Sequence, residues 1–600
     1  MSPTEKKSAA KKPAAKKPAA KKPAGKKPAE AEYDPPRPWI KSYAKGVPAE
    51  IALPTGSLYD LIAASVSEFG DNVALEFFGR TTTYGEMNDQ ILRAAEGLRV
   101  LGVQKGDTVA LVLPNCPQHI VAFYAALRLG AIVIEHNPLY TPRELRHQFE
   151  DHGAKVAFVW NNVVDTVQAF PDDVKVETLI SVDVTRAMPF GTRALLRLPI
   201  ARARESRAQL TTKVRSTLLW EKLLESDPID EHIFSPDATD VALIQYTSGT
   251  TGLPKGATLT HQNLLTNAAQ ARAWVPTVKR GTSVVYAVLP MFHAYGLTLC
   301  LTFAMSMGAR LVLFPKFDPD LVLPVIKKHP ATFLPAVPPI YERLTAAAKE
   351  MHVSLKGIEI AISGAMPLSA SVVEPWEAGT GGYLVEGYGL SETSPVLMAN
   401  PVGPSRVAGT VGLPMPNTEV RVVDPDKPTV DRKPGAEGEL IVRGPQVFSG
   451  YWKKPEETSA VFVPASDDGL PWFRTGDIVT IDDKGFVRIV DRIKELIITG
   501  GFNVAPSEVE DALREHPDIK DVAVIGLPSE HSGEDVVAAV VLEPGKSLDE
   551  DGIRKYARDN LTAYKVPRRV VQVDELPRSL IGKVLRKQVK DDLIAKDAAK

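Results

Sequence analysis

Two kinds of segment alternate along the first half of this 600-residue chain, and this alternation restricts the fold more than any other feature. Between residue 59 and about residue 315, apolar runs typical of strands are followed by segments with helical periodicity. Residues 108–113 and 131–134 predict strands, and residues 118–129 between them predict a helix. Such alternation predicts βαβ units with parallel strands, so we expect an α/β fold.

The pattern changes after about residue 417. Short strands separated by turns, such as residues 419–423 and 439–442, indicate a small antiparallel barrel or sheet. A second unit begins after Arg492, with a helix near residues 507–515 and strands such as residues 537–542. We therefore expect a large N-terminal domain of several subdomains, with βαβ-type sheets and a small β-barrel, and a smaller α+β C-terminal domain. More than one domain is also what the chain length favours.

The N-terminal segment has a composition of its own. Lysine pairs recur every five residues with Pro and Ala between them, so that residues 1–28 hold ten lysines and one acid, Glu5. Such a segment cannot bury apolar area, and we expect residues 1–36 to be a disordered tail. It lacks the apolar core of a secretory signal. A polybasic tail can bind DNA, RNA or anionic lipid, or stay solvated without a partner, and these alternatives stay open.

One apolar segment has the length of a membrane span. Residues 283–309 contain no Asp, Glu, Lys or Arg over 27 positions. Pro290 and His293 interrupt the segment, and Gly296 and Gly308 follow. We therefore expect a buried core strand, a loop and a helix from about Leu297 rather than a single span.

Residues 186–222, from Arg186 to Lys222, form a basic insert in which arginines alternate with large apolar side chains. This composition suits a segment that lies on an anionic membrane surface. A pair of solvated helices is the alternative, because Pro199 breaks any single long helix. Cys116 and Cys300 are the only cysteines, which fits a reducing cytosol. We expect a cytoplasmic protein that can lie peripherally on the inner face of the membrane.

Residues 246–256, YTSGTTGLPKG, are the most informative stretch for function. Glycine lets the backbone approach a ligand closely, and successive N–H groups in such a loop bind phosphate oxygens. The hydroxyls add donors and Lys255 adds a positive charge. The loop therefore predicts a site for nucleotide phosphates. Its spacing differs from the P-loop pattern, and a flexible surface loop is the alternative reading.

Three further motifs follow in order: YGLSE at residues 388–392, RTGD at 474–477 and DRIKE at 491–495. Together with the glycine-rich loop they resemble the adenylate-forming superfamily of acyl-CoA synthetases, firefly luciferases and nonribosomal peptide adenylation domains. The resemblance runs from about Pro38 to Lys587. Residues 137–145, 384–390 and 501–504 look most like bacterial long-chain fatty acid–CoA ligases.

The resemblance implies a set of nucleotide-binding residues. The β- and γ-phosphates of ATP would be held by Thr247, Ser248, Gly249, Thr250, Thr251, Gly252 and Lys255. Adenine would be enclosed by Gly364, Ala365, Gly387, Tyr388 and Gly389, and Ser391 would reach the α-phosphate. Asp477 and Arg492 would bind the ribose. Glu392 and Thr247 would bind Mg²⁺, a hard cation that prefers oxygen ligands.

The catalytic residues implied by the resemblance are Lys583, Thr247, Glu392 and His293. Lys583 would contact the carboxylate and the α-phosphate as the acyl adenylate forms, and His293 would lie beside the acyl carboxylate. The resemblance also implies a hinge at Lys494, about which a mobile C-terminal domain of residues 494–600 turns against residues 37–493. Gly500 and Gly501 would border the path of coenzyme A.

The implied activity is an acid–thiol ligase that converts a long-chain fatty acid to acyl-CoA with ATP and coenzyme A, through acyl-AMP. An acyl-AMP ligase, an aryl-acid CoA ligase and an amino acid adenylation domain are the alternatives within the superfamily. Residues 290–293 contain no acid that could hold an amine, which disfavours amino acids. Outside the superfamily, a nucleic-acid-binding protein and a membrane-anchored scaffold are the alternatives. A homodimer is compatible with the resemblance.

Overall fold

The structure is a computed structural model, and it describes residues 37–598 apart from residues 175, 231–232, 234, 248–253, 466–468, 500–501, 530–532 and 580–581. The lysine-rich tail predicted at residues 1–36 lies outside the described residues.

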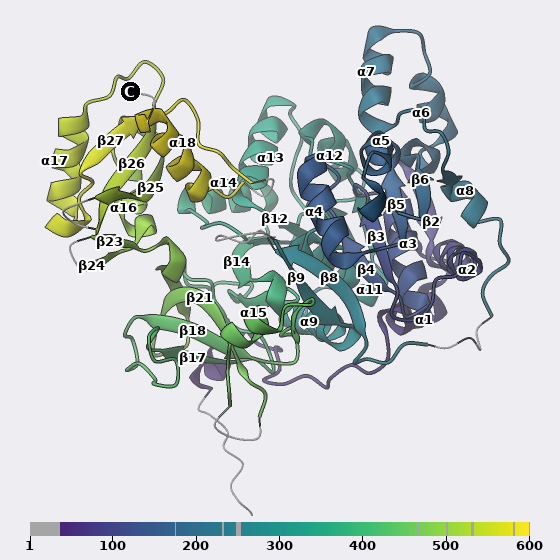
Figure 1. Cartoon of the computed structure of the whole chain (residues 1–600), viewed down its shortest axis with the longest axis horizontal. Helices are drawn as coiled ribbons and strands as arrows, with labels where there is room; N and C mark the ends of the chain where they lie inside the picture. The colour runs from purple at the N-terminus through teal and green to yellow at the C-terminus, as the bar shows by residue number, and fades with distance from the viewer. Residues whose placement is uncertain are drawn as a thin grey trace, which may run out of the picture. The chain divides into compact units, whose positions relative to one another are not determined.

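An eight-stranded sheet confirms the predicted βαβ units (Figure 1). Its order is β19 (Gly450–Tyr451), β9 (Lys255–Thr260), β8 (Val241–Thr247), β4 (Ile132–Glu135), β3 (Thr108–Val112), β5 (Val156–Trp160), β6 (Thr178–Val182) and β7 (Leu218–Leu219). Neighbouring strands from β8 to β7 pair in parallel, whereas β9 pairs antiparallel with β8 and β19. The helix predicted between β3 and β4 is α3 (Pro117–Arg128), as a parallel crossover requires.

A nine-stranded sheet follows the order β16 (Leu413–Pro414), β15 (Val396–Ala399), β14 (Tyr383–Gly389), β13 (Ile360–Ser363), β12 (Phe333–Ala336), β10 (Val284–Ala287), β11 (Arg310–Leu313), β1 (Val73–Phe77) and β2 (Arg80–Thr83). The strands from β14 to β1 are parallel. Gly364 follows the carboxyl end of β13, and the segment 387–389 forms that of β14. Ligands bind at such ends in open α/β sheets.

The helices next to the two sheets share one apolar core with them. Buried residues of α1 (Leu58–Phe69), α2 (Tyr84–Val100), α3 and α9 (His261–Trp274) belong to the same cluster as strands of both sheets. Residues 118–128 of α3 are all buried, in agreement with the mostly apolar sequence of this helix. Ser57, Thr83 and Thr260 begin α1, α2 and α9 with capping boxes, so their own sequences fix the starts of these helices.

The charge-free segment 283–309 forms β10, then α10 (Ala294–Gly296), the π-helix η5 (Leu297–Thr302) and α11 (Phe303–Met307). The predicted order of strand, loop and helix is confirmed. None of the helices in the described ranges combines the length and the apolarity that crossing a membrane requires. Short π-helical turns occur frequently at functional sites, and η5 lines the pocket described below.

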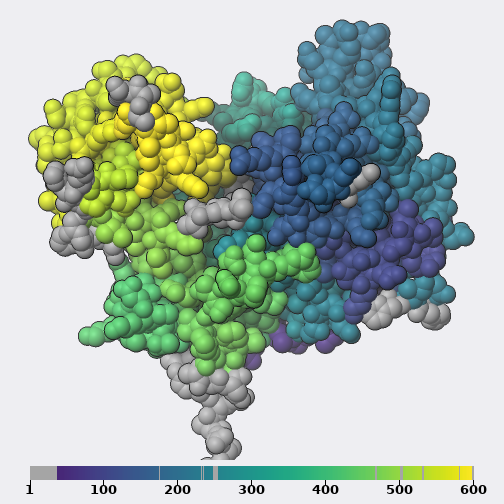
Figure 2. All heavy atoms as spheres, in the orientation of Figure 1, coloured from purple at the N-terminus to yellow at the C-terminus, as the bar shows by residue number. Residues whose placement is uncertain are grey.

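The basic insert contains the helices α6 (Phe190–Leu195) and α7 (Ala201–Leu210), followed by β7 and α8 (Trp220–Leu223). Pro199 lies between α6 and α7, at the predicted break. No residue of α6 and only Ala203 of α7 is buried. In Figure 2 these two helices form the blue protrusion at the upper right.

Residues 419–492 form an antiparallel sheet, one of the two arrangements that the sequence pattern allowed. The strands are β17 (Glu419–Val423), β18 (Gly438–Arg443), β21 (Trp472–Ile481) and β20 (Phe462–Val463), with β22 (Val487–Arg492) also paired to β21. No pairing between described residues joins β17 to β20 or β22, so these strands form an open sheet, the second of the two arrangements.

The C-terminal residues form the predicted smaller α+β domain (Figure 1). Its sheet contains β24 (Phe502–Val504), β23 (Ile497–Thr499), β26 (Gly533–Leu542), β25 (Ile519–Ser529) and β27 (Arg569–Gln572). Alternate residues of β25 and β26 enter two cores. One core packs against α16 (Pro506–Arg514) and α17 (Glu550–Asn560), and the other against α18 (Arg586–Ala598). This period of two explains why the sheet is covered on both faces.

Candidate active site

A pocket opens beside the carboxyl ends of β13 and β14. Seven of the residues predicted for the site line it: His293, Gly364, Ala365, Gly387, Tyr388, Gly389 and Ser391. Much of the remaining lining is apolar and includes Trp274, Leu299 and Val396. The structure therefore places the predicted adenine motifs and an apolar cavity side by side.

Small residues are required where the two strands end. A Cβ atom on Gly389 would lie 1.8 Å from the carbonyl oxygen of Pro395, and one on Gly364 would lie 3.0 Å from the Tyr295 ring. The Tyr295 hydroxyl donates to the carbonyl oxygens of Ala336 at 3.2 Å and Ile362 at 2.7 Å. Tyr295 was not singled out from the sequence, although it lies only two positions after His293.

Tyr388, Asp477 and Arg492 form a chain of polar contacts from the pocket to the antiparallel sheet. The Tyr388 hydroxyl donates to the Asp477 carboxylate. Arg492 Nε lies 2.9 Å from Asp477 Oδ1, across the antiparallel pair of β21 and β22. Burial raises the pKa of Asp477, and the Arg492 guanidinium opposes this effect. A buried carboxylate with these two partners suits a pair of ribose hydroxyls.

Lys583 lies in a turn that reaches the same place. Arg578 Nη1 donates to the Gly582 carbonyl oxygen at 2.7 Å, and the Ser579 N–H donates to that of Lys583 at 2.7 Å. A Cβ atom on Gly582 would lie 3.1 Å from Met366 Sδ, so the turn abuts the segment that follows Ala365. Burial and Arg492 lower the pKa of Lys583, whereas Glu495 and Asp477 raise it. Lys583 therefore lies close enough to Asp477 and Arg492 for their charges to affect its pKa.

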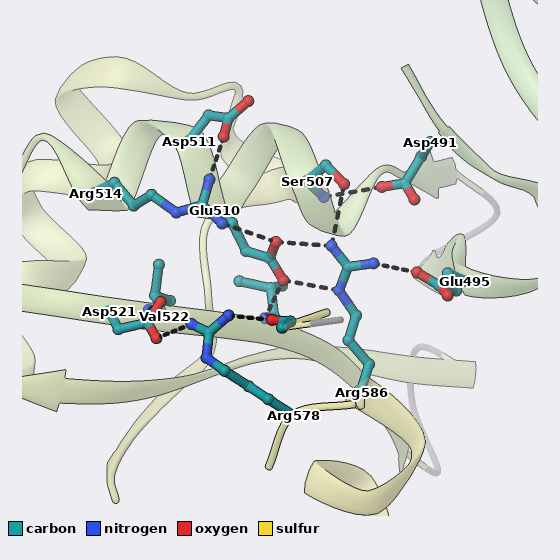
Figure 3. Close-up of polar contacts among 12 residues, drawn as sticks. Asp491, Glu495, Ser507, Glu510, Asp511, Arg514, Asp521, Val522, Arg578 and Arg586 are labelled. Carbon is teal, nitrogen blue, oxygen red and sulfur yellow. Dashed lines mark hydrogen bonds and ion pairs between the residues drawn. The ribbon is translucent and has the colours of Figure 1, made fainter. Parts of the chain in front are cut away.

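Arg586 anchors this turn within the C-terminal domain (Figure 3). Its Nε and Nη2 donate to Glu510 Oε1 and Oε2 at 2.8 and 2.7 Å, and Nη2 also donates to Ser507 Oγ at 3.1 Å. Nη1 donates to Glu495, beside the predicted hinge residue Lys494 in η7 (Ile493–Glu495). The Arg side chain thus joins the Lys583 turn to α16 and to the segment after β22.

Glu392 and Lys255 come from different parts of the chain and both contact Tyr451. Tyr451, not singled out from the sequence, donates its hydroxyl to Glu392 Oε1 at 2.8 Å, and its ring centroid lies 5.1 Å from Lys255 Nζ. Lys255 pairs with Thr247 across β8 and β9. Burial raises the pKa of Glu392, and the Tyr451 hydroxyl opposes this effect.

His293 gives the pocket a neutral polar group. Its Nδ1 accepts the Tyr295 N–H at 3.3 Å and caps α10. Burial lowers the pKa of His293 to about 4, so the imidazole is uncharged near neutral pH. A neutral imidazole beside apolar walls can hydrogen-bond a carboxyl group without forming an ion pair with it.

The remaining predicted residues lie outside the described residues. They are Ser248, Gly249, Thr250, Thr251 and Gly252 of the phosphate loop, and Gly500 and Gly501. Among the residues that are described, no group of three or more His, Cys, Asp or Glu side chains could hold a metal ion. A metal at Glu392 would therefore need further ligands from another source, such as phosphate oxygens.

Comparison with known proteins gives matches along both parts of the chain. Residues 62–452 match the family of AMP-binding enzymes, and residues 508–583 match the AMP-binding enzyme C-terminal domain. A long-chain-fatty-acid–CoA ligase of Bacillus subtilis (strain 168) is 38% identical over 562 residues, which cover 93% of this chain and 98% of the relative. One from Escherichia coli O157:H7 is 36% identical, with 92% and 98% covered.

A solved structure agrees with these sequence matches. The crystal structure of ATP-bound MatB from Rhodopseudomonas palustris is similar at a TM-score of 0.76 and 30% identity, covering 89% of this chain and 98% of that one. The resemblance found in the motifs is thus confirmed over nearly the whole length, and this chain belongs to the adenylate-forming family of AMP-binding enzymes.

Proposed function

We propose that this chain activates a long-chain fatty acid with ATP and transfers the acyl group to coenzyme A. The observation that carries this proposal is the pocket in which an apolar wall meets the residues predicted to enclose adenine. A fatty acyl chain needs a dry apolar cavity, and a nucleotide needs the glycine-lined edge next to it. The names of the relatives from B. subtilis and E. coli also favour a long-chain fatty acid.

In the proposed first step, a carboxylate oxygen of the fatty acid attacks the α-phosphorus of ATP. The bond from this phosphorus to the bridging oxygen breaks, and pyrophosphate leaves with the electron pair. In the second step, the coenzyme A thiolate attacks the acyl carbonyl carbon and AMP leaves. A free carboxylate is a poor acyl donor, so the mixed anhydride formed first is what makes the second step feasible.

Asp477, Arg492 and Tyr388 are proposed to hold the nucleoside. The Asp477 carboxylate would accept hydrogen bonds from the ribose hydroxyls, while Arg492 orients it and Tyr388 offers its ring to adenine. Ser391 would donate to the α-phosphate. Thr247, Lys255 and the loop between them would hold the β- and γ-phosphates, because backbone N–H groups and a lysine suit dense negative charge.

Lys583 is proposed to bring the two reacting anions together. Its ammonium group would contact the fatty carboxylate and the α-phosphate, whose mutual repulsion otherwise opposes the attack. His293 would hydrogen-bond the carboxylate at the pocket entrance. The same proposal includes a domain boundary between residues 37–493 and 494–600 and a turn of the C-terminal domain about Lys494 after adenylation. Coenzyme A would then enter past Gly500 and Gly501.

Glu392 and Thr247 are proposed to bind Mg²⁺ together with ATP. Glu392 fits this role because it is a buried carboxylate whose charge is stabilised by the Tyr451 hydroxyl and by Arg492 at a distance. Mg²⁺ is commonly bound by one or two protein oxygens plus substrate phosphates, in agreement with the small donor set here. When bound, the ion would neutralise phosphate charge.

A panel of acids from short to long chain tests the substrate class, with pyrophosphate release scored with and without coenzyme A. Each methylene buried in the pocket contributes about 0.8 kcal/mol to the binding free energy of the acid. We therefore expect kcat/KM to fall by about fourfold for each buried methylene that is removed. Formation of acyl-AMP without thioester would indicate an acyl-AMP ligase instead. Faster turnover of benzoates or cinnamates than of palmitate would indicate an aryl-acid CoA ligase.

The helices α6 and α7 favour peripheral contact with an anionic membrane. The segment 186–222 contains nine basic and two acidic residues. Phe190 is 83% exposed, Leu195 63% and Ile200 54%, so large apolar groups face outward among the arginines. Basic side chains attract anionic headgroups, and apolar ones insert at the interface.

Co-sedimentation with vesicles of phosphatidylglycerol and phosphatidylcholine tests this contact. Replacing Arg193, Arg197, Arg202 and Arg204 by Gln is expected to reduce binding strongly. The matched control replaces the exposed Lys327, Lys328, Lys349 and Lys356 by Gln. Equal loss of vesicle binding in both variants would indicate that the net positive charge of the protein, and not segment 186–222, causes the binding. Deletion of residues 1–28 measures the separate contribution of the tail to vesicle binding.

A homodimer is a further part of the proposal, and light scattering of the purified protein tests it.

A further inference from the structure

Tyr451 touches two of the predicted site residues, Lys255 of the phosphate site and Glu392 of the Mg²⁺ site, from a third segment of the chain. Its backbone pairs with Ala257 across β19 and β9, and the Trp452 N–H donates to the Gly256 carbonyl oxygen at 2.7 Å. This pairing places the Tyr451 ring over the side chain of Lys255, with 5.1 Å from Nζ to the ring centroid. The hydroxyl at the far end of the ring donates to Glu392 Oε1 at 2.8 Å.

The orientation of Tyr451 is fixed by contacts on its other side. The Tyr451 N–H donates to Thr458 Oγ1 at 2.9 Å, and Thr458 Oγ1 in turn donates to the Lys454 carbonyl oxygen at 2.8 Å. The Phe448 ring packs edge-on against the Tyr451 ring at 5.0 Å between centroids. Phe448 also donates its N–H to the Glu392 carbonyl oxygen at 2.8 Å. The segment 448–458 therefore holds both the backbone and the carboxylate of Glu392.

The two ends of the Tyr451 side chain suit opposite charges. A phenol hydroxyl donates to a carboxylate, whereas the face of an aromatic ring attracts an ammonium group. No ion pair joins Lys255 directly to Glu392, although both residues are described and both contact the Tyr451 side chain. In a direct ion pair, the charges of Lys255 and Glu392 would neutralise each other. Each would then interact less strongly with phosphate oxygens or a cation.

We propose that Tyr451 is a positioning residue for adenylation that orients Glu392 through its hydroxyl and keeps Lys255 apart from this carboxylate through its ring. The inference rests on the proposed function, because it needs a nucleotide whose phosphates meet both charges. It assigns different tasks to the two parts of one side chain. The hydroxyl serves the carboxylate, and the ring face serves the lysine.

Two substitutions separate these tasks. Tyr451→Phe keeps the ring over Lys255 and removes the donor to Glu392. It is expected to leave the metal-free affinity for a fluorescent ATP analogue within about twofold of wild type. It is expected to lower kcat of ATP–pyrophosphate exchange by about tenfold or more, as loss of a hydrogen bond to a charged group does. Tyr451→Leu removes both contacts and is expected to weaken metal-free binding as well, by about three- to tenfold.

A double-mutant cycle with Lys255→Met tests the ring contact directly. If the ring acts through Lys255, Tyr451→Leu costs little additional nucleotide affinity once the lysine is absent. Tyr383→Phe is the matched control, because the Tyr383 ring also lies under a cation, with 5.9 Å to the Arg406 guanidinium carbon, but outside the pocket. Thermal melting of each variant separates these effects from a loss of folded protein.

Three results would overturn the inference: unchanged kcat in Tyr451→Phe, equal metal-free affinities in Tyr451→Phe and Tyr451→Leu, or full additivity in the cycle. Failure of the proposed function would give a different result from these three. Wild type itself would then show no pyrophosphate exchange with any carboxylic acid.

Discussion

Arg492 and Asp477 face each other on adjacent antiparallel strands, with 2.9 Å between Nε and Oδ1, at the end of the sheet nearest the pocket. The side chain of Asp477 is 2% exposed and that of Arg492 is 34% exposed. The carboxylate is thus taken out of water while its partner keeps contact with solvent. Tyr388, on β14 of the nine-stranded sheet, supplies the second contact to Asp477. The proposed ribose site therefore depends on contacts between two separately formed sheets.

Asp477→Asn tests this dependence. The amide keeps one acceptor for Tyr388 but loses the charge that balances Arg492, and it is a weaker partner for a diol. We expect KM for ATP to rise about 10- to 100-fold, the range for lost hydrogen bonds to a charged group. The free energy of unfolding should fall by about 1–3 kcal/mol, less than for a fully buried pair because Arg492 stays partly solvated. Asp483→Asn, on an exposed turn, is the control for both measurements.

Lys583→Ala separates the two half-reactions. Because the ammonium group is proposed to act only while carboxylate and α-phosphate combine, ATP–pyrophosphate exchange should fall by about 10²- to 10³-fold. Thioester formation from supplied acyl-AMP and coenzyme A should stay within about tenfold of wild type. Lys587→Ala removes an exposed lysine of the same basic stretch and should leave both rates unchanged. Equal losses in the two half-reactions would contradict the assigned role.

Local sequence indicates those parts of the pocket lining that depend on backbone shape. Gly364 and Gly389 lie at strand ends where a Cβ atom would strike neighbouring atoms, and glycine in the sequence reports such crowding directly. The contacts of Tyr451 could not be predicted in this way. Glu392 and Tyr451 are 59 positions apart and meet only after β19 has paired with β9.

The same distinction explains why the strand pattern of residues 419–492 left both a barrel and a sheet open. Alternating strands and turns in residues 419–492 specify antiparallel pairing, but closure depends on which edges meet. β21 uses one edge for β18 and the other for both β20 and β22, so the strands β17 and β20 remain at separate ends. Edge pairing is a long-range property that strand patterns do not encode.

Arg586→Met tests the anchor of the Lys583 turn. Without the guanidinium, the carboxylates of Glu495 and Glu510 would lose their shared cation, although the Val524 N–H would still donate to Glu510 Oε1 at 2.8 Å. Breaking a buried pair in this way destabilises a domain by about 3–5 kcal/mol, and we expect a loss of this size in chemical denaturation.

Arg586→Lys distinguishes anchoring from stability alone. The lysine keeps the charge but cannot donate through a planar fork to both oxygens of Glu510. We expect the domain to stay folded while pyrophosphate exchange drops by about tenfold, because the turn that carries Lys583 loses its fixed position. Arg558→Lys, exposed on α17, should have no effect. Wild-type exchange in Arg586→Lys would show that the anchor is not needed for adenylation.

Glu386 gives the protein a dependence on pH that is separate from the chemistry. It lies directly before Gly387 and accepts the Leu368 N–H at 3.2 Å. Burial raises its pKa from 4.5 to about 7, against the opposing effects of two backbone N–H groups and Arg488. Between these two pH values the folded chain keeps a proton that the unfolded chain has lost. The contribution of Glu386 to stability is therefore fully present below about pH 4.5 and is lost as the pH rises through about 7.

Glu386→Gln removes this proton equilibrium while keeping an acceptor for the Leu368 N–H. Relative to wild type, the variant should gain stability steadily from about pH 4.5 to about pH 7 and keep a constant advantage above that range. Urea denaturation midpoints of both proteins across this range measure the difference, with Glu437→Gln, exposed directly before β18, as the control. A difference that does not vary with pH would mean that Glu386 titrates alike in the folded and unfolded chains, and that its burial does not penalise the charged form.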